Sequence, residues 1–133
     1  MQQIREKEYL IENLQTSQQE PSVPLRYEAF DLLYRLKTEP RYGLVQTEDE
    51  WLQLYAVINR LYGDIVDKLR NCPQLTGQDV RVCYLVHARL NNAALGILFN
   101  VDGRSITKSK QRIKKKMEID GDLSLEEYLM KGK

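Results

Sequence analysis

The sequence is poor in the residues from which disulfide scaffolds, metal sites and catalytic triads are built. Its 133 residues include two cysteines and one histidine, too few for a disulfide framework or for a zinc site with four cysteine ligands. We expect a structural or surface role for His87, and free thiols at Cys72 and Cys83, with a redox pair as the less favoured alternative. The carboxylates show no acid–base spacing and the glycines form no phosphate loop. The sequence therefore predicts no enzyme, no metal and no cofactor.

Long apolar runs are also missing. No stretch approaches the roughly 20 residues that a membrane-spanning helix needs, and no charged segment followed by an apolar one opens the chain as a secretory leader would. We therefore expect a soluble, cytoplasmic protein. The composition, 42% hydrophobic and 29% charged, is that of an ordinary globular domain, and the length fits one domain or one domain with an arm.

The net charge of the whole chain is only +1, but the charges are unevenly distributed along it. Residues 1–74 carry 9 basic and 12 acidic side chains, residues 75–117 carry 9 and 2, and residues 118–133 carry 2 and 5. The middle segment therefore has a formal charge of +7 between two flanks of −3. Such a local field attracts polyanions even when the whole molecule is nearly neutral.

Helical periodicity recurs along the chain, and no segment of useful length alternates with the period of a strand. The sequence predicts an all-α fold with helices over residues 25–38, 47–69, 76–90, 91–99, 103–117 and 123–130. Thr47 with Glu50, and Thr76 with Asp79, have the spacing of capping boxes that begin helices. We expect Gly63 to kink or split the helix in which it lies.

The beginning of the chain forms a separate part. It is rich in glutamine and glutamate and carries a weak apolar stripe at Ile4, Ile11 and Leu14, which predicts a helical linker or a coiled-coil arm. Two prolines then interrupt the helical pattern. We divide the chain into an arm over residues 1–22, a helical buttress region over residues 23–74 and a C-terminal domain over residues 75–133.

The helix expected over residues 103–117 has one narrow apolar stripe, formed by Ile106, Ile113 and Met117. At about 100° per residue, four long polar side chains lie within about 40° of the opposite direction: Arg104, Lys108, Gln111 and Lys115. No acidic residue lies among the seven cations of residues 104–116. Because a major groove admits one α-helix and these side chains suit base edges and phosphates, the pattern favours nucleic acid over a merely solvated basic helix.

The segment that ends with this helix resembles a known family. Its pattern is Leu75-Thr76-x-x-Asp79-x-x-Val82-x-x-Leu85, then Asn92-x-x-Leu95-Gly96-x-x-Phe99-x-Val101, then Ser105-Ile106-x(6)-Ile113-x-x-Lys116-Met117. The spacing is similar, without a gap, to that of the LuxR/NarL-type helix-turn-helix effector domain. The resemblance implies a four-helix, winged-helix-like effector domain whose recognition helix, at about residues 103–117, binds a specific DNA sequence.

A closer resemblance is to a Bacteroides-type version of this domain, over roughly residues 47–130. In that version a Trp-bearing helix precedes the domain and a short helix closes it, and Trp51–Leu69 and Leu123–Leu129 fit these parts. Such domains usually end a longer chain, after tetratricopeptide repeats or a membrane sensor and a helical linker. The resemblance therefore implies the C-terminal output domain of a transcriptional regulator, anchored to the membrane if a membrane sensor precedes it.

Four positions depart from the family pattern. Arg89 stands at a turn where the family often has glycine, and Asn91 replaces the usual serine. Gly96 replaces the usual alanine, and we expect it to weaken its helix slightly because glycine is a poor helix former. Ser109 stands where many members have histidine. We expect these departures to affect base preference rather than the fold.

The resemblance also implies which residues contact DNA. It places base-edge contacts at Thr107, Lys108 and Gln111. The candidates for phosphate contacts are Arg104, Lys110, Lys114 and Lys115. We expect Arg112 and Lys116 to point sideways and be solvated. Thr76 and Asn92 are expected to cap helices, with a phosphate at the free backbone N–H groups as the alternative.

Double-stranded DNA is thus the predicted partner. Regulators of this kind commonly bind as dimers, and we expect a homodimer through the N-terminal stripe or through the last helix, with Leu125, Tyr128 and Leu129. The alternative is a helical protein-interaction or oligomerisation module whose basic face binds an acidic protein partner. An exposed basic face favours DNA, whereas a face covered by acidic residues of the first 74 favours the alternative or autoinhibition.

Overall fold

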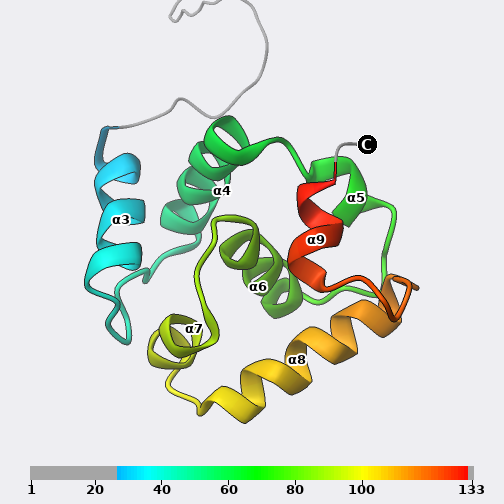
Figure 1. Ribbon diagram of the computed structural model, residues 1–133. Coiled ribbons are helices and arrows are strands. Elements are labelled where there is room, and N and C mark those ends of the chain that lie inside the picture. Colours follow the sequence, from blue (N-terminus) through cyan, green and yellow to red (C-terminus); the bar gives the residue numbers. More distant parts are fainter. Residues whose placement is uncertain (1–26, 132–133) are drawn as a thin grey trace, which may run out of the picture.

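The computed structural model describes residues 27–131, and these contain seven α-helices and no β-strand (Figure 1). The helices are α3 (Tyr27–Thr38), α4 (Glu48–Tyr62), α5 (Val66–Arg70), α6 (Gly77–His87), α7 (Asn92–Phe99), α8 (Gly103–Lys116) and α9 (Leu125–Met130). The all-α prediction is confirmed for this part of the chain, and the predicted arm lies outside it. None of these helices combines the length and the apolar character needed to cross a membrane.

Side-chain caps begin two helices where the sequence predicts them. At the start of α4 the Thr47 hydroxyl accepts a hydrogen bond from the Glu50 backbone N–H, and the Glu50 carboxylate accepts one from the Thr47 N–H. The same reciprocal pair joins Thr76 and Asp79 at the start of α6. Both capping boxes are therefore confirmed, and each satisfies backbone donors that the first turn of a helix leaves free.

Gly63 splits the long helix expected over residues 47–69. Its backbone φ is +108°, a value that L side chains rarely adopt, and α4 ends directly before it. The Asn59 side-chain carbonyl then accepts a hydrogen bond from the Ile65 N–H at 3.1 Å, which holds the break in place. The apolar pattern continues into α5, where Leu69 is buried.

The central element of the molecule is α6, which lies between the other helices in Figure 1. It packs against α4, α8 and α9, and its Cys83, Leu85 and Val86 are fully buried. The surrounding helices complete the same core with Leu36, Leu54, Ile58, Leu95, Ile113, Leu125 and Leu129. Because each buried aliphatic side chain contributes about 1.5–3 kcal/mol, this core fixes where α8 lies.

The two leucines of the last helix, α9, lie inside the core. Leu125 and Leu129 are 1% and 2% exposed and belong to the core. The Lys68 ammonium of α5 donates to the backbone carbonyls of Tyr128 and Leu129 and holds the end of α9. Leu125 and Leu129 are therefore not available for the predicted dimer contact through the last helix, whereas Tyr128 is half-buried and the dimer itself stays a prediction. The other predicted dimer contact, the N-terminal stripe, lies outside the described residues.

Arg89 forms the turn between α6 and α7 in a left-handed backbone conformation, with φ +73°. This conformation costs an L residue roughly 1–2 kcal/mol. The Arg89 side chain donates to the His87 carbonyl oxygen at 2.8 Å and lies over the Tyr62 ring at 5.3 Å from its centroid. These contacts hold a residue other than glycine where the backbone favours glycine.

Gly96 is required by the turn between α7 and α8. A Cβ at this position would lie 2.7 Å from the backbone carbonyl oxygen of Val101, far inside van der Waals contact. The Val101 N–H donates to the Gly96 carbonyl at 2.9 Å, so the turn closes directly onto the glycine. Gly96 therefore has a steric role beside the expected weakening of its helix: an alanine would displace the turn that leads into α8.

Candidate nucleic-acid interface

One narrow apolar stripe anchors α8, as predicted. Ile106 and Ile113 are 2% and 0% exposed, and Met117 is half-buried where the helix ends. At the other end the Asp102 carboxylate accepts a hydrogen bond from the Ser105 N–H at 2.9 Å and caps the helix. One side of α8 is therefore packed in the core, and its opposite side faces outward.

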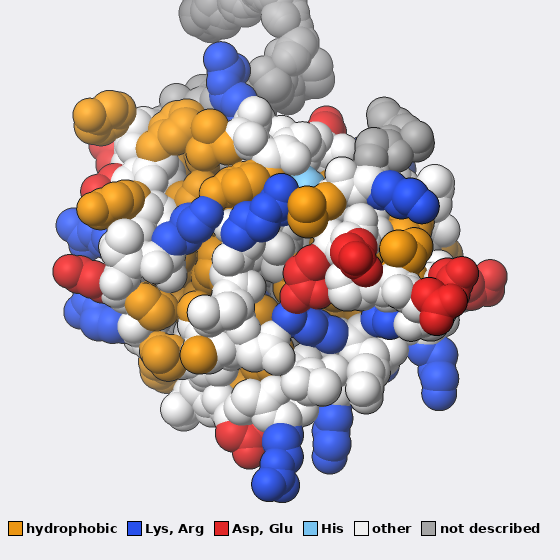
Figure 2. Space-filling model, in the orientation of Figure 1, with side chains coloured by type: hydrophobic (Ala, Val, Ile, Leu, Met, Phe, Trp, Pro, Cys, Tyr) orange, Lys and Arg blue, Asp and Glu red, His pale blue; other side chains and the backbone are white. Residues whose placement is uncertain are grey.

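This opposite side carries four exposed side chains that we call the basic row: Arg104, Lys108, Gln111 and Lys115. Within residues 27–131 no carboxylate forms an ion pair with its three cations. Lys and Arg side chains project from the lower right edge of the molecule, along α8 (Figure 2). Glu48 of α4 and Asp31 of α3 pair with arginines elsewhere. These two carboxylates therefore do not cover the basic row.

A shallow depression of about 470 Å³ lies beside the basic row, between α8 and the start of α7. Its lining residues are Asn92, Gly103, Arg104, Thr107, Lys108 and Gln111. The structure thus brings the three side chains predicted to contact bases to one surface, together with one predicted to contact phosphate. Of the other phosphate candidates, Lys115 lies further along the row and Lys114 is half-buried at its side.

Two further cations of α8 turn towards Asp79, a carboxylate that the sequence assigned only to a cap. Asp79 is 1% exposed and accepts hydrogen bonds from Lys116 at 2.7 Å and from Arg112 at 3.2 Å. Burial raises the pKa of this carboxyl, but the hydrogen bonds from Lys116, the Thr76 N–H and Arg112 outweigh it and hold the pKa below its ordinary value. The solvated role expected for Arg112 and Lys116 is therefore corrected: both tie α8 to α6.

Lys110, a predicted phosphate contact, has partners within the protein. Its side chain is only 14% exposed, and its ammonium lies 2.5 Å from a Glu126 carboxylate oxygen on α9 and 2.5 Å from Asn92 Oδ1 on α7. Burial raises the pKa of the Glu126 carboxyl, but the Lys110 hydrogen bond helps to hold it below its ordinary value, so this carboxylate is ionised at neutral pH. Lys110 therefore connects three helices instead of standing in the basic row.

Asn92 continues this connection to the depression. Its Nδ2 donates to Thr107 Oγ1 at 3.2 Å, and the Thr107 hydroxyl donates to the Gly103 carbonyl oxygen at 3.1 Å. The cap of α7 is Asn91, whose side chain accepts from the Ala94 N–H at 2.8 Å. The capping role expected for Asn92 is therefore corrected, because its amide is shared between Lys110 and Thr107.

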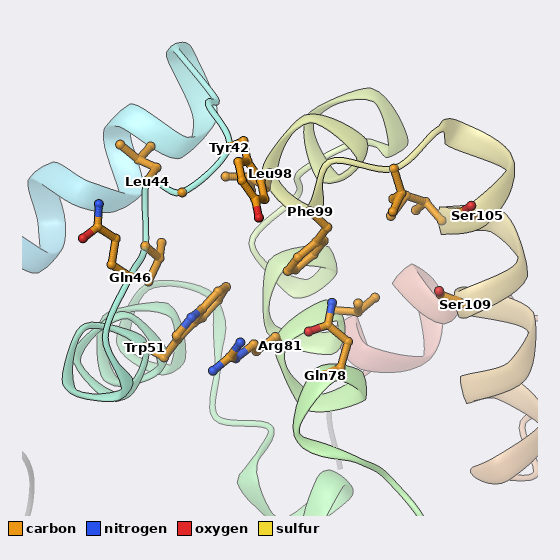
Figure 3. A pocket seen from close by; sticks show the side chains of 15 residues that line it. Tyr42, Leu44, Gln46, Trp51, Gln78, Arg81, Leu98, Phe99, Ser105 and Ser109 are labelled. Carbon is orange, nitrogen blue, oxygen red and sulfur yellow. The ribbon is translucent and has the colours of Figure 1, made fainter.

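A second cleft, of about 630 Å³, opens on another side of α8 (Figure 3). The rings of Trp51 on α4 and Phe99 on α7 are nearly parallel there, with centroids 6.4 Å apart and an interplanar angle of 7°. The Arg81 guanidinium of α6 lies 4.8 Å from the centroid of Trp51. The residues of α8 that line this cleft are Ser105, Ile106 and Ser109. These residues lie outside the basic row, so the cleft is a separate surface, and Ser109 belongs to it.

The single histidine and the two cysteines lie in the interior of the protein. His87 is 1% exposed, and its Nε2 lies 2.8 Å from the Gly63 carbonyl oxygen, as expected of a structural histidine. Cys72 and Cys83 are both free, and burial raises the pKa of Cys83 to about 12, which keeps its thiol protonated and unreactive. Within residues 27–131 no three His, Cys, Asp or Glu side chains gather to hold a metal ion.

No family model, curated protein or solved structure matches this chain. Over residues 27–131 the chain is an all-helical protein with an exposed, basic helix face.

Proposed function

We propose that this protein binds double-stranded DNA in a sequence-specific manner, as the C-terminal output domain of a transcriptional regulator. In this proposal α6, α7 and α8 form a helix-turn-helix of the LuxR/NarL type, and α8 is the recognition helix. The observation that carries the proposal is the basic row, which is exposed, has no ion-pair partner within residues 27–131 and lies opposite the edge by which α8 is held in the core.

The dimensions of α8 suit a major groove. The groove is about 12 Å wide and admits one α-helix. The 14 residues of α8 span about 21 Å at 1.5 Å per residue, which is roughly six base pairs at 3.4 Å per base pair. No acidic side chain lies within the helix, so none of its own residues would repel the phosphates on either side.

The positions of the side chains suggest their roles. The candidates for base edges are Thr107, Lys108 and Gln111, which meet at the depression. The candidates for phosphates are Arg104, Lys114 and Lys115. Lysine suits the acceptors of guanine, and glutamine suits the acceptor and donor pair of adenine. Phosphate contacts contribute most of the affinity and fix the register of the helix in the groove.

Two features outside the row support the resemblance to the family. Arg89 adopts the left-handed conformation that the family's frequent glycine at this turn would adopt without strain. The pairs of Asp79 with Arg112 and Lys116 hold α8 against α6, which gives a recognition helix one fixed orientation. Both features concern how α8 is presented, which is what a helix-turn-helix must control.

The test is an anisotropy titration of a fluorescent duplex with the protein at several salt concentrations. We expect the logarithm of the association constant to fall linearly with the logarithm of the salt concentration. Its slope should be about −0.9 for each phosphate contact, or about −3 per protomer for the three phosphate candidates. The absence of salt-dependent binding to any duplex overturns the proposal. Binding to poly-glutamate without binding to DNA would favour the protein-interaction alternative.

A further inference from the structure

Four polar side chains from three helices form one connected set beside the basic row, which we call the Lys110 network. Glu126 and Asn92 each accept a hydrogen bond from the Lys110 ammonium at 2.5 Å. Asn92 then donates to Thr107 at 3.2 Å. The network begins in a partly buried ion pair and ends on Thr107, an exposed residue that lines the depression.

The hydrogen bonds of Thr107 limit what it offers to a base. A hydroxyl has one donor and two acceptor lone pairs. The donor of Thr107 goes to the Gly103 carbonyl oxygen at 3.1 Å, and one lone pair accepts from Asn92. The hydroxyl therefore has no proton left for O6 or N7 of guanine. The apolar group that Thr107 can offer to a base edge is its methyl.

We propose that the Lys110 network holds Thr107 in one rotamer, from which its methyl group contacts the C5-methyl of a thymine. Thr107 is then a specificity-determining residue, and Lys110 is a positioning residue and not a phosphate contact. The inference rests on the proposed DNA-binding function and adds one base to it. Thymine is the base that carries a methyl group in the major groove, and threonine methyls are among its known contacts.

The charges of the network explain why Lys110 stays with the protein. An isolated lysine on this helix would be drawn to phosphate, but the Glu126 carboxylate holds the Lys110 ammonium where 14% of the side chain is exposed. The Lys110 ammonium in turn donates a hydrogen bond to the Asn92 side-chain oxygen, so that the Asn92 Nδ2 points to Thr107. Without Lys110 the Asn92 amide is free to rotate. Thr107 then keeps only its hydrogen bond to the Gly103 carbonyl, and a threonine with such a bond in a helix divides between two rotamers.

The probe is a duplex that the wild-type chain selects from a randomised pool, and the same duplex with each thymine replaced in turn by deoxyuridine. Deoxyuridine lacks only the C5-methyl. We expect one replacement to weaken binding about fourfold, the effect of burying one methyl-sized group. Thr107→Val keeps a methyl and should keep this sensitivity without the network, because valine in a helix strongly prefers one rotamer whereas threonine divides between two. Thr107→Ser keeps the hydroxyl but lacks the methyl and should bind both duplexes equally.

The network itself is tested with a pair of double variants that leave the net charge unchanged. Lys110→Met with Glu126→Gln should abolish the sensitivity to deoxyuridine and leave the salt slope as in the wild type. The control, Lys114→Met with Glu118→Gln, removes a phosphate candidate. It should reduce the magnitude of the salt slope by about 0.9 and retain the sensitivity. Thermal unfolding verifies that both variants are folded.

The outcomes separate this inference from the proposed function. A salt slope reduced by about 0.9 in the Lys110 and Glu126 variant assigns Lys110 to a phosphate and overturns the inference. An unchanged sensitivity to deoxyuridine in that variant also overturns it. A wild type that binds DNA but is insensitive to every deoxyuridine replacement overturns the inference and leaves DNA binding intact. The absence of any binding overturns both.

Discussion

The buried carboxylate of Asp79 accepts a hydrogen bond from the Lys116 ammonium at 2.7 Å, across 37 residues of sequence. The same side chain accepts from the Thr76 N–H as part of the capping box that begins α6. One carboxylate therefore sets both the start of the central helix and the place of the last turn of α8. An interface on α8 depends on this contact although Asp79 itself is inaccessible to any ligand.

Replacing Asp79 is expected to be strongly destabilising. Asp79→Ala leaves the Lys116 and Arg112 cations without their partner and removes half of the capping box. We expect the free energy of unfolding to fall by about 3 kcal/mol, measured by urea denaturation. The matched control is Asp67→Ala, which removes an exposed carboxylate of α5 and should change stability by less than about 0.5 kcal/mol. Equal losses in the two variants would contradict a structural role for the buried pair.

Two lysines of the basic row should differ in what their removal does to DNA binding. Lys115→Ala should weaken binding to all duplexes about equally and reduce the magnitude of the salt slope by about 0.9. Lys108→Ala should instead weaken the preferred duplex, by about 1–3 kcal/mol, more than a scrambled one. Both effects are measured by titration against the two duplexes.

The control for these variants is Arg60→Ala, an exposed residue in the last turn of α4. It changes the net charge by the same amount as each lysine variant. We expect its affinity and salt slope to equal those of the wild type. If Arg60→Ala reproduced the effect of Lys115→Ala, the binding would reflect overall charge and not the basic row.

Alanine at position 96 is expected to destabilise the protein, although alanine is the better helix former by about 1 kcal/mol. The new Cβ would lie 2.7 Å from the Val101 carbonyl oxygen, and relieving this overlap typically costs 1–3 kcal/mol. Gly77→Ala is the control, because a Cβ there meets nothing within 4 Å. A thermal melt in which Gly96→Ala is as stable as Gly77→Ala would show that the turn before α8 is not tightly closed.

Two substitutions at Arg89 isolate the effect of its backbone conformation. Arg89→Gly and Arg89→Ala both remove the contacts to the His87 carbonyl and to Tyr62. Only glycine adopts a φ of +73° without strain. We therefore expect the glycine variant to be more stable than the alanine variant by about 1–2 kcal/mol, measured by chemical denaturation. Equal stability of the two variants would mean that this turn relaxes when the arginine is lost.

His87 should make the stability of the protein depend on pH near neutrality. Burial lowers the pKa of this imidazole below its ordinary 6.5, against the opposing hydrogen bond to Gly63, while Arg89 and Lys68 lower it further. Between the two pKa values the unfolded chain binds more protons, so the free energy of unfolding rises with pH. The contribution of the neutral His87 imidazole to the free energy of unfolding is fully present above about pH 6.5 and is lost as the pH falls below this value.

The measurement is the urea midpoint across this pH range for the wild type and for His87→Gln. The chain has a single histidine, so the variant removes imidazole titration altogether. We expect its midpoint to be nearly flat where that of the wild type rises. Parallel curves for the two proteins would show that other groups are responsible.

Much of the fold could be read from local pattern. The capping boxes at Thr47 and Thr76, the break at Gly63 and the buried stripe of Ile106 and Ile113 depend on residues within one or two turns of each other. Helical geometry fixes such relationships directly, because residues three and four apart share a face. The same arithmetic correctly placed the four members of the basic row on the exposed side of α8.

Only the tertiary structure shows which cations of α8 remain free to bind a ligand. The sequence shows seven cations in one segment, but Lys110, Arg112 and Lys116 are taken by carboxylates that lie 16, 33 and 37 residues away. No local spacing encodes such pairs, since they depend on how α6 and α9 pack against α8. A buried or half-buried carboxylate must be paired because leaving a charge unpaired away from water is costly. The sequence determined a basic helix and its outward side, and the packing of the two neighbouring helices decided which of its charges remain for a polyanion.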